Sequence, residues 1–328
     1  MNDLPPHHSV SEPTRPAGHS LLFWVMPLVM GLLIWTLLMP LPMEGRLASA
    51  LGDLAHAPAF AVVAWGCYGV ARRLGLGRLQ AALLAWLLLT LFGAATEVVQ
   101  NYVGRSESWQ DGLNDAIGAA GGVLIGVAWE TSPLARKALL ALVGTLLVFA
   151  TEFYPLVTVW DCYRQTREMP RLASFENWME TDRWWSSDAE MQRVASHATD
   201  GRWALRVDLL PGHYPGVMLS ESPPDWSHYK ELVFDIEVEP SAQGSNPAEP
   251  LELIVKLQDK IHNGEVDDRF HRIVRLTPGR HEVRIPLSEV AGAPRGRRMD
   301  LTRMGMLQFF AIQPPQRRTF YLDNVRLE

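Results

Sequence analysis

Residues 111–129 read DGLNDAIGAAGGVLIGVAW, and this stretch decides how the first half of the chain is organised. From residue 116 to 129 it contains no charged side chain, and Gly118, Gly122 and Gly126 repeat a G-x-x-x-G spacing along it. Small residues at this spacing let the backbones of two apolar helices approach closely. The pattern therefore predicts a membrane-spanning helix whose glycine face is buried in a helix bundle.

Similar apolar runs lie on both sides of this helix. Because a membrane span needs about 20 apolar residues, we expect a bundle of five transmembrane helices, at about 21–43, 54–71, 79–100, 112–129 and 136–160. A cleaved signal peptide is the alternative for the first run. Its apolar region exceeds the usual ~7–15 residues, and Arg15 is the only basic residue before it, so an uncleaved span after a disordered tail over residues 1–20 is the better interpretation.

The charged residues divide the chain into two halves. Residues 1–160 hold 18 charged side chains and the remainder holds 48, although the whole chain of 328 residues averages 20% charged, 48% hydrophobic and a net charge of −6. A typical globular domain is ~25% charged, so the composition excludes a single soluble domain. The mild acidity argues against a nucleic-acid partner, and two cysteines, Cys67 and Cys162, are too few for a disulfide framework.

Arginine and lysine predict the orientation of the spans. Cytoplasmic loops carry an excess of these residues, and most of the basic residues of the first half lie in alternate loops. The predicted amino terminus is therefore cytoplasmic, and everything after Trp160 lies outside. The cytoplasmic side carries Arg15, Arg72, Arg73, Arg78, Arg136 and Lys137, and the opposite side carries Arg46 and Arg105.

Polar residues of the membrane half gather at its predicted outer face. Ionisable groups at membrane depth are costly and by default indicate function. The structural alternatives are a helix cap for Asp111, a Glu97–Arg105 ion pair, and polar contacts between helices, worth ~0.6–2 kcal/mol each. Glu152 either joins the group or extends toward the interface. The candidate site cluster is His56, Glu97, Gln100, Arg105, Asp111 and Asn114.

This cluster resembles the motif of the VanZ-like family of bacterial membrane proteins. The resemblance covers about residues 20–130 and rests on His56, Glu97-x-x-Gln100, and Arg105-Ser106-x-Ser108-x-x-Asp111-x-x-Asn114-x-x-x-Gly118. The family commonly has a lysine three residues before the histidine, where this chain has Asp53. The resemblance implies an inner-membrane protein of the bacterial cell envelope, in a family named for glycopeptide resistance, with the carboxyl-terminal half in the periplasm or otherwise extracytoplasmic.

After Trp160 the sequence changes to short alternating runs separated by turn residues. Leu232, Phe234, Ile236 and Val238, for example, alternate with more polar neighbours. Ten such runs with turns such as Asn263-Gly264 predict an all-β antiparallel sandwich of the jelly-roll type over 165–328. The expected strands are 172–176, 191–197, 203–209, 216–221, 231–238, 251–258, 269–276, 281–287, 306–313 and 318–327.

The order of these runs resembles the galactose-binding-like sandwich shared by many carbohydrate-binding modules. The matching pieces are Phe175-Glu176-x-Trp178, Thr199-Asp200-Gly201-x-x-Ala204-Leu205-x-Val207, Trp226-Ser227-x-Tyr229-x-x-Leu232-x-Phe234 and Phe320-Tyr321-Leu322-Asp323-Asn324-Val325. The resemblance implies a structural calcium ion held by Glu176 and Asp323, with a further ligand from the Asp200 turn. The alternative is that each carboxylate is a solvated group at a strand end. Because flat aromatic rings suit sugars, Trp184, Trp185 and Trp203 are candidate ligand contacts, although most tryptophans of a sandwich are core residues.

Three functions remain open from the sequence. The first is an envelope protein that handles or shields a surface or lipid-linked glycan, with a sugar-binding outer domain. The second is a non-catalytic membrane anchor that displays a glycan-binding module. The third, a small transporter, is least favoured because the spans show no repeat related by two-fold symmetry. The sequence carries no phosphate-binding glycine loop, H-E-x-x-H helix or nucleophile elbow, and it leaves open whether a reaction is catalysed.

Overall fold

A computed structural model describes residues 45–102, 109–241 and 248–328, and of residues 97 and 100–102 only the backbone. The described chain forms two compact units, one over Ala48–Leu156 and one over Gly45–Leu47 with Val157–Glu328. The tail over 1–20, the predicted span over 21–43 and Arg105 lie outside the described residues.

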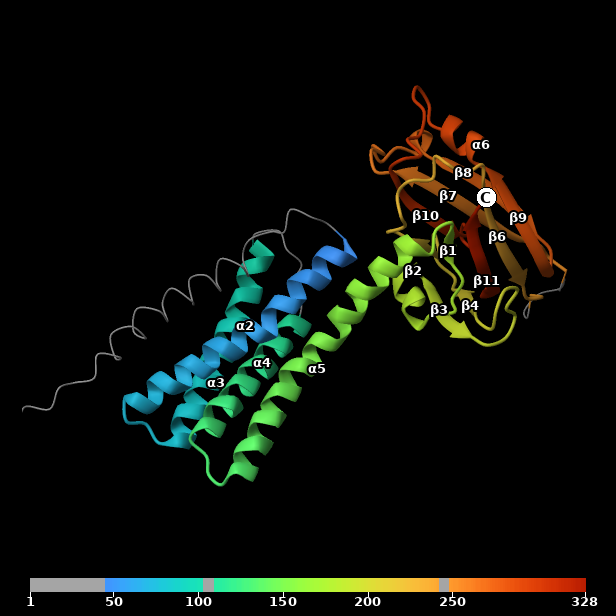
Figure 1. The fold of residues 1–328 in the computed structure, drawn as a ribbon. Coiled ribbons are helices and arrows are strands. Elements are labelled where there is room, and N and C mark those ends of the chain that lie inside the picture. Colours follow the sequence, from blue (N-terminus) through green and yellow to red (C-terminus); the bar gives the residue numbers. More distant parts are fainter. Residues whose placement is uncertain (1–44, 103–108, 242–247) are drawn as a thin grey trace, which may run out of the picture. The chain divides into compact units, whose positions relative to one another are not determined.

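Four helices make up the first unit and the start of the second (Figure 1): α2 over Arg46–Arg73, α3 over Arg78–Tyr102, α4 over Trp109–Trp129 and α5 over Leu134–Arg167. Each contains a segment long and apolar enough to cross a membrane by length and composition. They correspond to four of the five predicted spans. α2 begins before, and α5 ends beyond, the uncharged run that predicted it.

The glycines of α4 lie where other helices come close. A Cβ atom on Gly122 would lie 1.9 Å from the carbonyl oxygen of Ala61 in α2, and one on Gly118 would lie 2.5 Å from that of Ala57. Gly121 of α4 likewise faces the backbone of Gly144 in α5 at 2.7 Å. The predicted glycine packing face is confirmed, because no side chain fits between these backbones.

The two basic turns of the first unit meet at one end of the bundle. Arg72, at the end of α2, pairs with Glu130 after α4 at 2.9 Å, and Arg78, at the start of α3, pairs with the same carboxylate at 3.4 Å. The α2–α3 turn and the α4–α5 turn therefore share one end, as the alternation of basic loops predicted.

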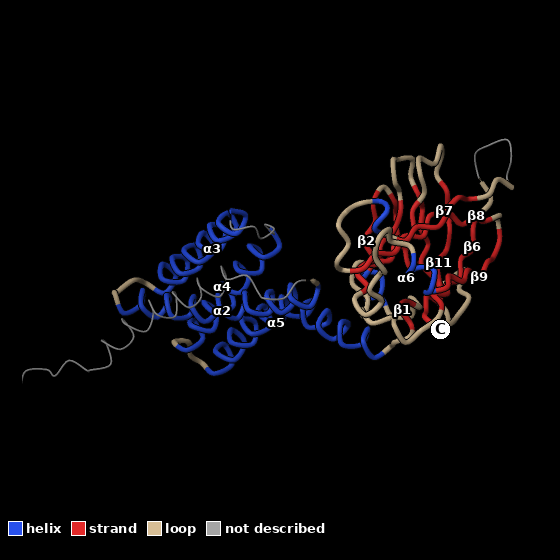
Figure 2. The backbone as a smooth tube through the Cα atoms, turned by 90° about the horizontal axis from the view of Figure 1, so that it is seen from above, coloured by secondary structure: helices blue, strands red, loops and turns tan. Residues whose placement is uncertain are grey.

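The second unit is an antiparallel sandwich of two sheets (Figures 1 and 2). One sheet has the order β3-β4-β11-β6-β9, with β1 paired to β11, and the other has the order β2-β5-β10-β7-β8. The strands are β1 Arg171–Ala173, β2 Trp184–Ser187, β3 Ala189–Val194, β4 Ala204–Leu209, β5 Gly216–Leu219, β6 Glu231–Val238, β7 Leu251–Asp259, β8 Phe270–Leu276, β9 Gly279–Pro286, β10 Met304–Phe310 and β11 Arg318–Leu327. Short helical elements are η1 Trp178–Arg183, η2 Val266–Asp268 and α6 Leu287–Gly292.

All ten predicted strands are present, with ends that shift by a few residues. The strand that the sequence did not predict is β2, where Trp184 and Trp185 were interpreted as a pair of ligand-contacting rings. In the sheet they alternate: Trp184 faces the core and is 4% exposed, whereas Trp185 is 61% exposed. Tryptophan has high strand propensity, so the same two residues also carried a strand signal.

The inner faces of both sheets form one apolar core. Alternate residues of β4, β6, β7 and β11 supply it, as the period-two pattern predicted, and the largest fully buried side chain is Trp226. The indole Nε1 of Trp226 donates a 2.9 Å hydrogen bond to the Pro223 carbonyl. Burial of this ring therefore leaves no polar atom of the ring unsatisfied.

A buried ion pair lies at the start of the second unit. The guanidinium of Arg183 in η1 contacts both oxygens of Asp161 in α5, at 2.6 and 3.0 Å. Arg46 contacts the same carboxylate at 3.0 Å. The Asp161 and Arg183 side chains are 0% and 1% exposed, so this cluster holds its charges away from water.

Candidate functional site

The first candidate site is a buried pair of polar side chains between α2 and α4. His56 Nδ1 and Asp115 Oδ1 lie 3.1 Å apart and are hydrogen-bonded, and the two side chains are 4% and 0% exposed. Gly93 of α3 makes room for the carboxylate, since a Cβ atom there would lie 2.9 Å from Asp115 Oδ2. Three helices thus enclose one ionisable pair in an apolar bundle.

Further carboxylates surround this pair. Asp53 and Asp111 are near enough to act electrostatically on His56, and Glu152 of α5 is near enough to interact with Asp53 and His56. Asp115 Oδ2 and Glu152 Oε2 are both buried and have no hydrogen-bond partner within the described part of the chain. All of these residues belong to the first unit. We define this group, His56, Asp53, Asp111, Asp115 and Glu152, as the helix-bundle cluster.

The sequence predicted part of this cluster. His56 and Asp111 belong to it, and Asn114 lies on α4 half-buried. Glu97 and Gln100 lie in α3, but their side chains fall outside the described residues, as does Arg105 entirely. Asp115 was missed, although Asp111, Asp115, Gly118 and Gly122 follow an i, i+4, i+7, i+11 spacing. That stripe follows one helix face.

The second candidate site is a cleft of about 480 Å³ on the outer face of the five-stranded sheet. Its lining combines aliphatic and aromatic side chains with a few polar ones, which is the composition expected of a small-ligand site. We name it the sheet cleft. Its lining residues are Tyr214, Ile254, Lys256, Val266, Arg269, His271, Gln308, Phe310 and Ile312.

Strand register brings the cleft residues together from three strands. Lys256 of β7 pairs with Gln308 of β10 on one side and with His271 of β8 on the other. One row further along, Ile254 of β7 pairs with Phe310 of β10. Since neighbouring residues of a strand point to opposite faces, the core residues of β7 and β10 place these side chains on the outer face.

Tyr214 forms an exposed wall of the cleft that rises above the strands of its floor. The ring is 59% exposed and packs edge-on against Phe310, with the centroids 6.0 Å apart and the planes at 77°. Gly216 makes room for Phe310, because a Cβ atom there would lie 2.5 Å from the Phe310 Cβ. The result is an exposed aromatic wall above an apolar floor.

A cluster of ion pairs around Arg297 holds the loop before β8, which lines the cleft on the side away from Tyr214. Arg297 binds the carboxylates of Asp259, at 2.6 and 2.9 Å, and of Asp268. Hydrogen bonds from Arg297 and from the Asn263 N–H lower the pKa of Asp268 to about 2. Because Asp268 immediately precedes Arg269, these ion pairs position the neighbouring lining residues Val266 and Arg269.

The three tryptophans predicted to contact a ligand do not lie in the cleft lining. Trp184 is a core residue that packs against Phe309 with ring centroids 6.0 Å apart, so the structure gives it a packing role. Trp185 is exposed on the outer face of β2, and Trp203 packs under the guanidinium of Arg193 at 3.8 Å. The cleft rings, Tyr214 and Phe310, carried no signal that separates them from other sandwich aromatics.

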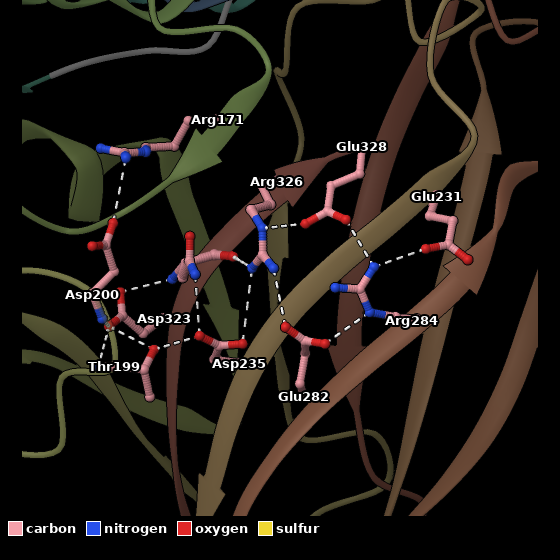
Figure 3. Close-up of polar contacts among 11 residues, drawn as sticks. Arg171, Thr199, Asp200, Glu231, Asp235, Glu282, Arg284, Asp323, Arg326 and Glu328 are labelled. Atoms are coloured by element: carbon pink, nitrogen blue, oxygen red, sulfur yellow. Dashed lines mark hydrogen bonds and ion pairs between the residues drawn. The ribbon is translucent and has the colours of Figure 1, made fainter.

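Glu176 and Asp323 brace one turn from two sides. Glu176 Oε1 accepts hydrogen bonds from the backbone N–H groups of Arg202 and Trp203, at 2.7 and 2.8 Å. Asp323 Oδ2 accepts those of Thr199 and Asp200, at 2.6 and 3.0 Å, as Figure 3 shows in part. Burial raises the pKa of Asp323, and these backbone donors act against that rise.

These contacts bear on the predicted calcium ion. N–H donors present positive hydrogens to the oxygens that a cation would need, and calcium takes six to eight oxygen ligands. Over the described residues no group of three or more His, Cys, Asp or Glu side chains is arranged to hold a metal. In this structure Glu176 Oε1 and Asp323 Oδ2 therefore accept backbone hydrogen bonds. The calcium ion stays a prediction, checked by the melting temperature with and without calcium.

The outer face of the six-stranded sheet carries a different surface, in which charges are paired. In Figure 3, Arg284 bridges Glu231, Glu282 and Glu328, at 3.0, 2.7 and 2.7 Å. Arg326 contacts the last two as well, at 3.1 and 2.8 Å. Such exposed pairs typically contribute ~0–1 kcal/mol each. The charges on this face are thus matched within the protein.

No family model matches the chain, and no curated protein matches it significantly. The VanZ-like resemblance therefore has no support from these comparisons. Solved structures match the sandwich. A family 11 carbohydrate-binding module from Clostridium thermocellum, in complex with a beta-1,3-1,4-mixed-linked tetrasaccharide, is 18% identical and has a TM-score of 0.38. The match covers 48% of this chain and 93% of that one.

Two further solved structures match over a similar share of this chain. A family 30 carbohydrate-binding module of a cellulosomal cellulase of Clostridium thermocellum is 16% identical with a TM-score of 0.35, over 44% of this chain and 90% of that one. An exo-beta-agarase is 17% identical with a TM-score of 0.38, over 48% of this chain and 24% of that one. Likeness at this level concerns the β-sandwich fold alone and does not identify a ligand for this chain.

Proposed function

We propose that this protein is held in the bacterial cell envelope by its apolar helices and binds a glycan in the sheet cleft. The observation that carries the proposal is the cleft itself, about 480 Å³ in volume, with an exposed aromatic wall at Tyr214. Lys256, His271 and Gln308 stand in one row across its floor. Sugars present apolar ring faces and a rim of hydroxyl groups, which suit such a combination of aromatic ring and hydrogen-bonding side chains.

The helices would hold this module at the membrane. Alternate turns of the bundle are basic, which favours a cytoplasmic position for the Arg72–Arg78 turn. On that orientation the sandwich is extracytoplasmic, where glycans of the envelope are found. Membrane anchoring with glycan display is sufficient for this function.

Replacing the exposed ring should weaken glycan binding. We expect Tyr214→Ala in the full-length protein, in phosphatidylcholine nanodiscs, to weaken binding of its best oligosaccharide about tenfold, because a stacked aromatic contact contributes ~0.5–1.5 kcal/mol beyond its buried area. Isothermal titration calorimetry after a glycan-array screen measures the effect. The matched control is Trp178→Ala, an aromatic residue 50% exposed outside the cleft, which should bind as wild type. Absence of any glycan binding contradicts the proposal.

We further propose, from the VanZ-like resemblance, that the helix-bundle cluster contacts the polar head of a lipid-linked glycan. What supports this is the complete burial of the His56–Asp115 pair among apolar helices, since ionisable groups at that depth are costly and rarely kept without a role. The pair lies toward the end of the bundle opposite the basic turns, which is the outer end in the proposed orientation.

An isosteric substitution tests this role, because it removes the charge of the side chain and keeps its size and shape. We expect Asp115→Asn to reduce growth under a cell-wall-directed glycopeptide to the level of the deletion strain, at unchanged protein level, because the charge is lost while the shape is kept. The control is Thr145→Val, an exposed threonine of α5 whose hydroxyl bonds only its own helix at Ala141. If Asp115→Asn expresses normally and grows like wild type, the pair is structural and the anchor function stands alone.

A further inference from the structure

The sheet cleft carries positive charge that the protein leaves unpaired. Among the described residues, the side chains of Lys256 and Arg269 have no hydrogen bond and no ion pair, and Arg269 Nε is buried without a partner. His271, which lies opposite Lys256 on the neighbouring strand, has no side-chain hydrogen bond or ion pair either. No aspartate or glutamate is among the lining residues. This contrasts with the other face of the sandwich, where arginines such as Arg284 and Arg326 are each matched by two or more carboxylates.

The acidic side chains near the cleft are paired with other arginines. Asp268, next to Arg269 in sequence, is bound by Arg297, and Asp267 pairs with Arg295. Glu252, on the outer face of β7, pairs with Arg275 at 2.8 Å. The two cations of the cleft also repel each other: burial, and then the charge of Arg269, lower the pKa of Lys256. Holding two like charges together at a partly buried site is unfavourable unless an anion completes it.

We propose that the sheet cleft selects an anionic saccharide, with a carboxylate or phosphate group of the sugar bound between Lys256 and Arg269. This rests on the proposed glycan-binding function and adds the class of ligand. Arginine presents a planar fork of N–H donors that matches carboxylate and phosphate oxygens, and lysine adds a point charge. Tyr214 and Phe310 would face the apolar side of the sugar ring, while His271 and Gln308 would contact its hydroxyl groups.

The source of the negative charge can be a uronic acid or a phosphorylated sugar. Both place a compact oxyanion on a ring with an apolar face, and the lining of the cleft is suited to either. A polyanion without sugar rings, such as polyglutamate, offers the charge but nothing for the aromatic wall.

The test uses the full-length protein in phosphatidylcholine nanodiscs, which carry no net lipid charge. Four probes of equal length are compared by calorimetry: an oligogalacturonate, its fully methyl-esterified neutral form, a phosphorylated dextran oligomer and polyglutamate. We expect at least one of the two acidic saccharides to bind about tenfold or more tightly than the neutral ester, and polyglutamate to bind more weakly than that saccharide. The better acidic saccharide identifies the source of the charge.

Variants locate the effect. Arg269→Gln and Lys256→Gln should each weaken binding of that acidic saccharide about tenfold and binding of the neutral ester much less, and Arg269→Lys should restore part of the loss. Arg275→Gln is the matched control: it removes a cation from the outer face of β8, the strand that follows Arg269, but one that is 75% exposed, paired with Glu252 and outside the cleft. It should bind as wild type.

The outcomes separate the two proposals. Equal affinity for the acidic and neutral saccharides overturns the anionic selection and leaves glycan binding standing. An equal loss in Arg275→Gln, or polyglutamate binding as tightly as the acidic saccharide, overturns it too, because either shows general charge attraction. If no saccharide binds at all, the proposed function itself fails.

Discussion

Gly122→Val is expected to prevent the helical unit from folding. A Cβ atom at this position would lie 1.9 Å from the Ala61 carbonyl oxygen and 2.6 Å from the Ala61 carbonyl carbon. Both are backbone atoms, so no side-chain rotation can relieve the overlap, and α2 and α4 would have to separate along their contact. Overpacking in a close-packed interior costs ~1–3 kcal/mol even where side chains can adjust, so the cost here should lie at or above the upper value.

The measurement is fluorescence-detected size exclusion of the detergent-solubilised protein, with the thermal unfolding midpoint. The variant should elute as aggregate or lose its transition. Gly69→Val is the matched control, because Gly69 lies on α2 in the same unit and a Cβ atom there meets nothing within 4 Å. A Gly122→Val protein that elutes and melts like Gly69→Val would contradict the close approach of α2 and α4.

Asp161→Ala is expected to lower the stability of the second unit by about 3–5 kcal/mol. The change leaves the Arg183 guanidinium, 1% exposed, without the carboxylate that it contacts twice, and it also removes the partner of Arg46. The buried guanidinium then keeps only the longer contact with Glu168 Oε2, at 3.4 Å. A buried cation that loses its main carboxylate partner costs far more than the loss of a surface pair.

Urea unfolding followed by tryptophan fluorescence measures this effect, since Trp184 and Trp226 lie in the sandwich core. Glu252→Ala, which breaks the exposed pair with Arg275 at 75% and 56% exposure, should cost ~0–1 kcal/mol. The double variant Asp161→Leu with Arg183→Met should regain part of the loss, because it removes both charges. An Asp161→Ala protein as stable as Glu252→Ala would contradict the burial of this pair.

Periodicity in the sequence was a sound guide to the elements. Apolar runs predicted the helices because a membrane span has a minimum length, and alternation predicted ten strands because only one face of each strand contacts the core. The strand that was missed, β2, begins with Trp184 and Trp185. Because both residues are aromatic, the sequence does not show that one faces the core and the other faces solvent. Periodicity could not pair the strands, since the pattern of Leu232 and Phe234 in β6 says which face is buried but not which strands lie beside it.

The candidate sites divide in the same way. His56 and Asp111 were predicted because a charge in an apolar run is conspicuous by itself. Asp115, the hydrogen-bond partner of His56, was overlooked because it is one of three polar residues among the five over 111–115, and only the approach of α2 to α4 distinguishes it. Lys256 and Arg269 had no signal in a half of the chain that is rich in arginine and lysine.

The sequence by itself determined that the chain has an apolar helical half and a charged β half, because composition and periodicity are local properties. It also determined that the glycines of α4 form a contact face. Only the tertiary structure decided which polar groups meet: His56 with Asp115, Asp161 with Arg183, and Lys256 beside Arg269 in a cleft whose described lining contains no acid. The physical reason is that pairing and charge balance depend on strand register and helix contacts between residues far apart in the chain. A local sequence pattern does not specify which of these distant residues lie close together.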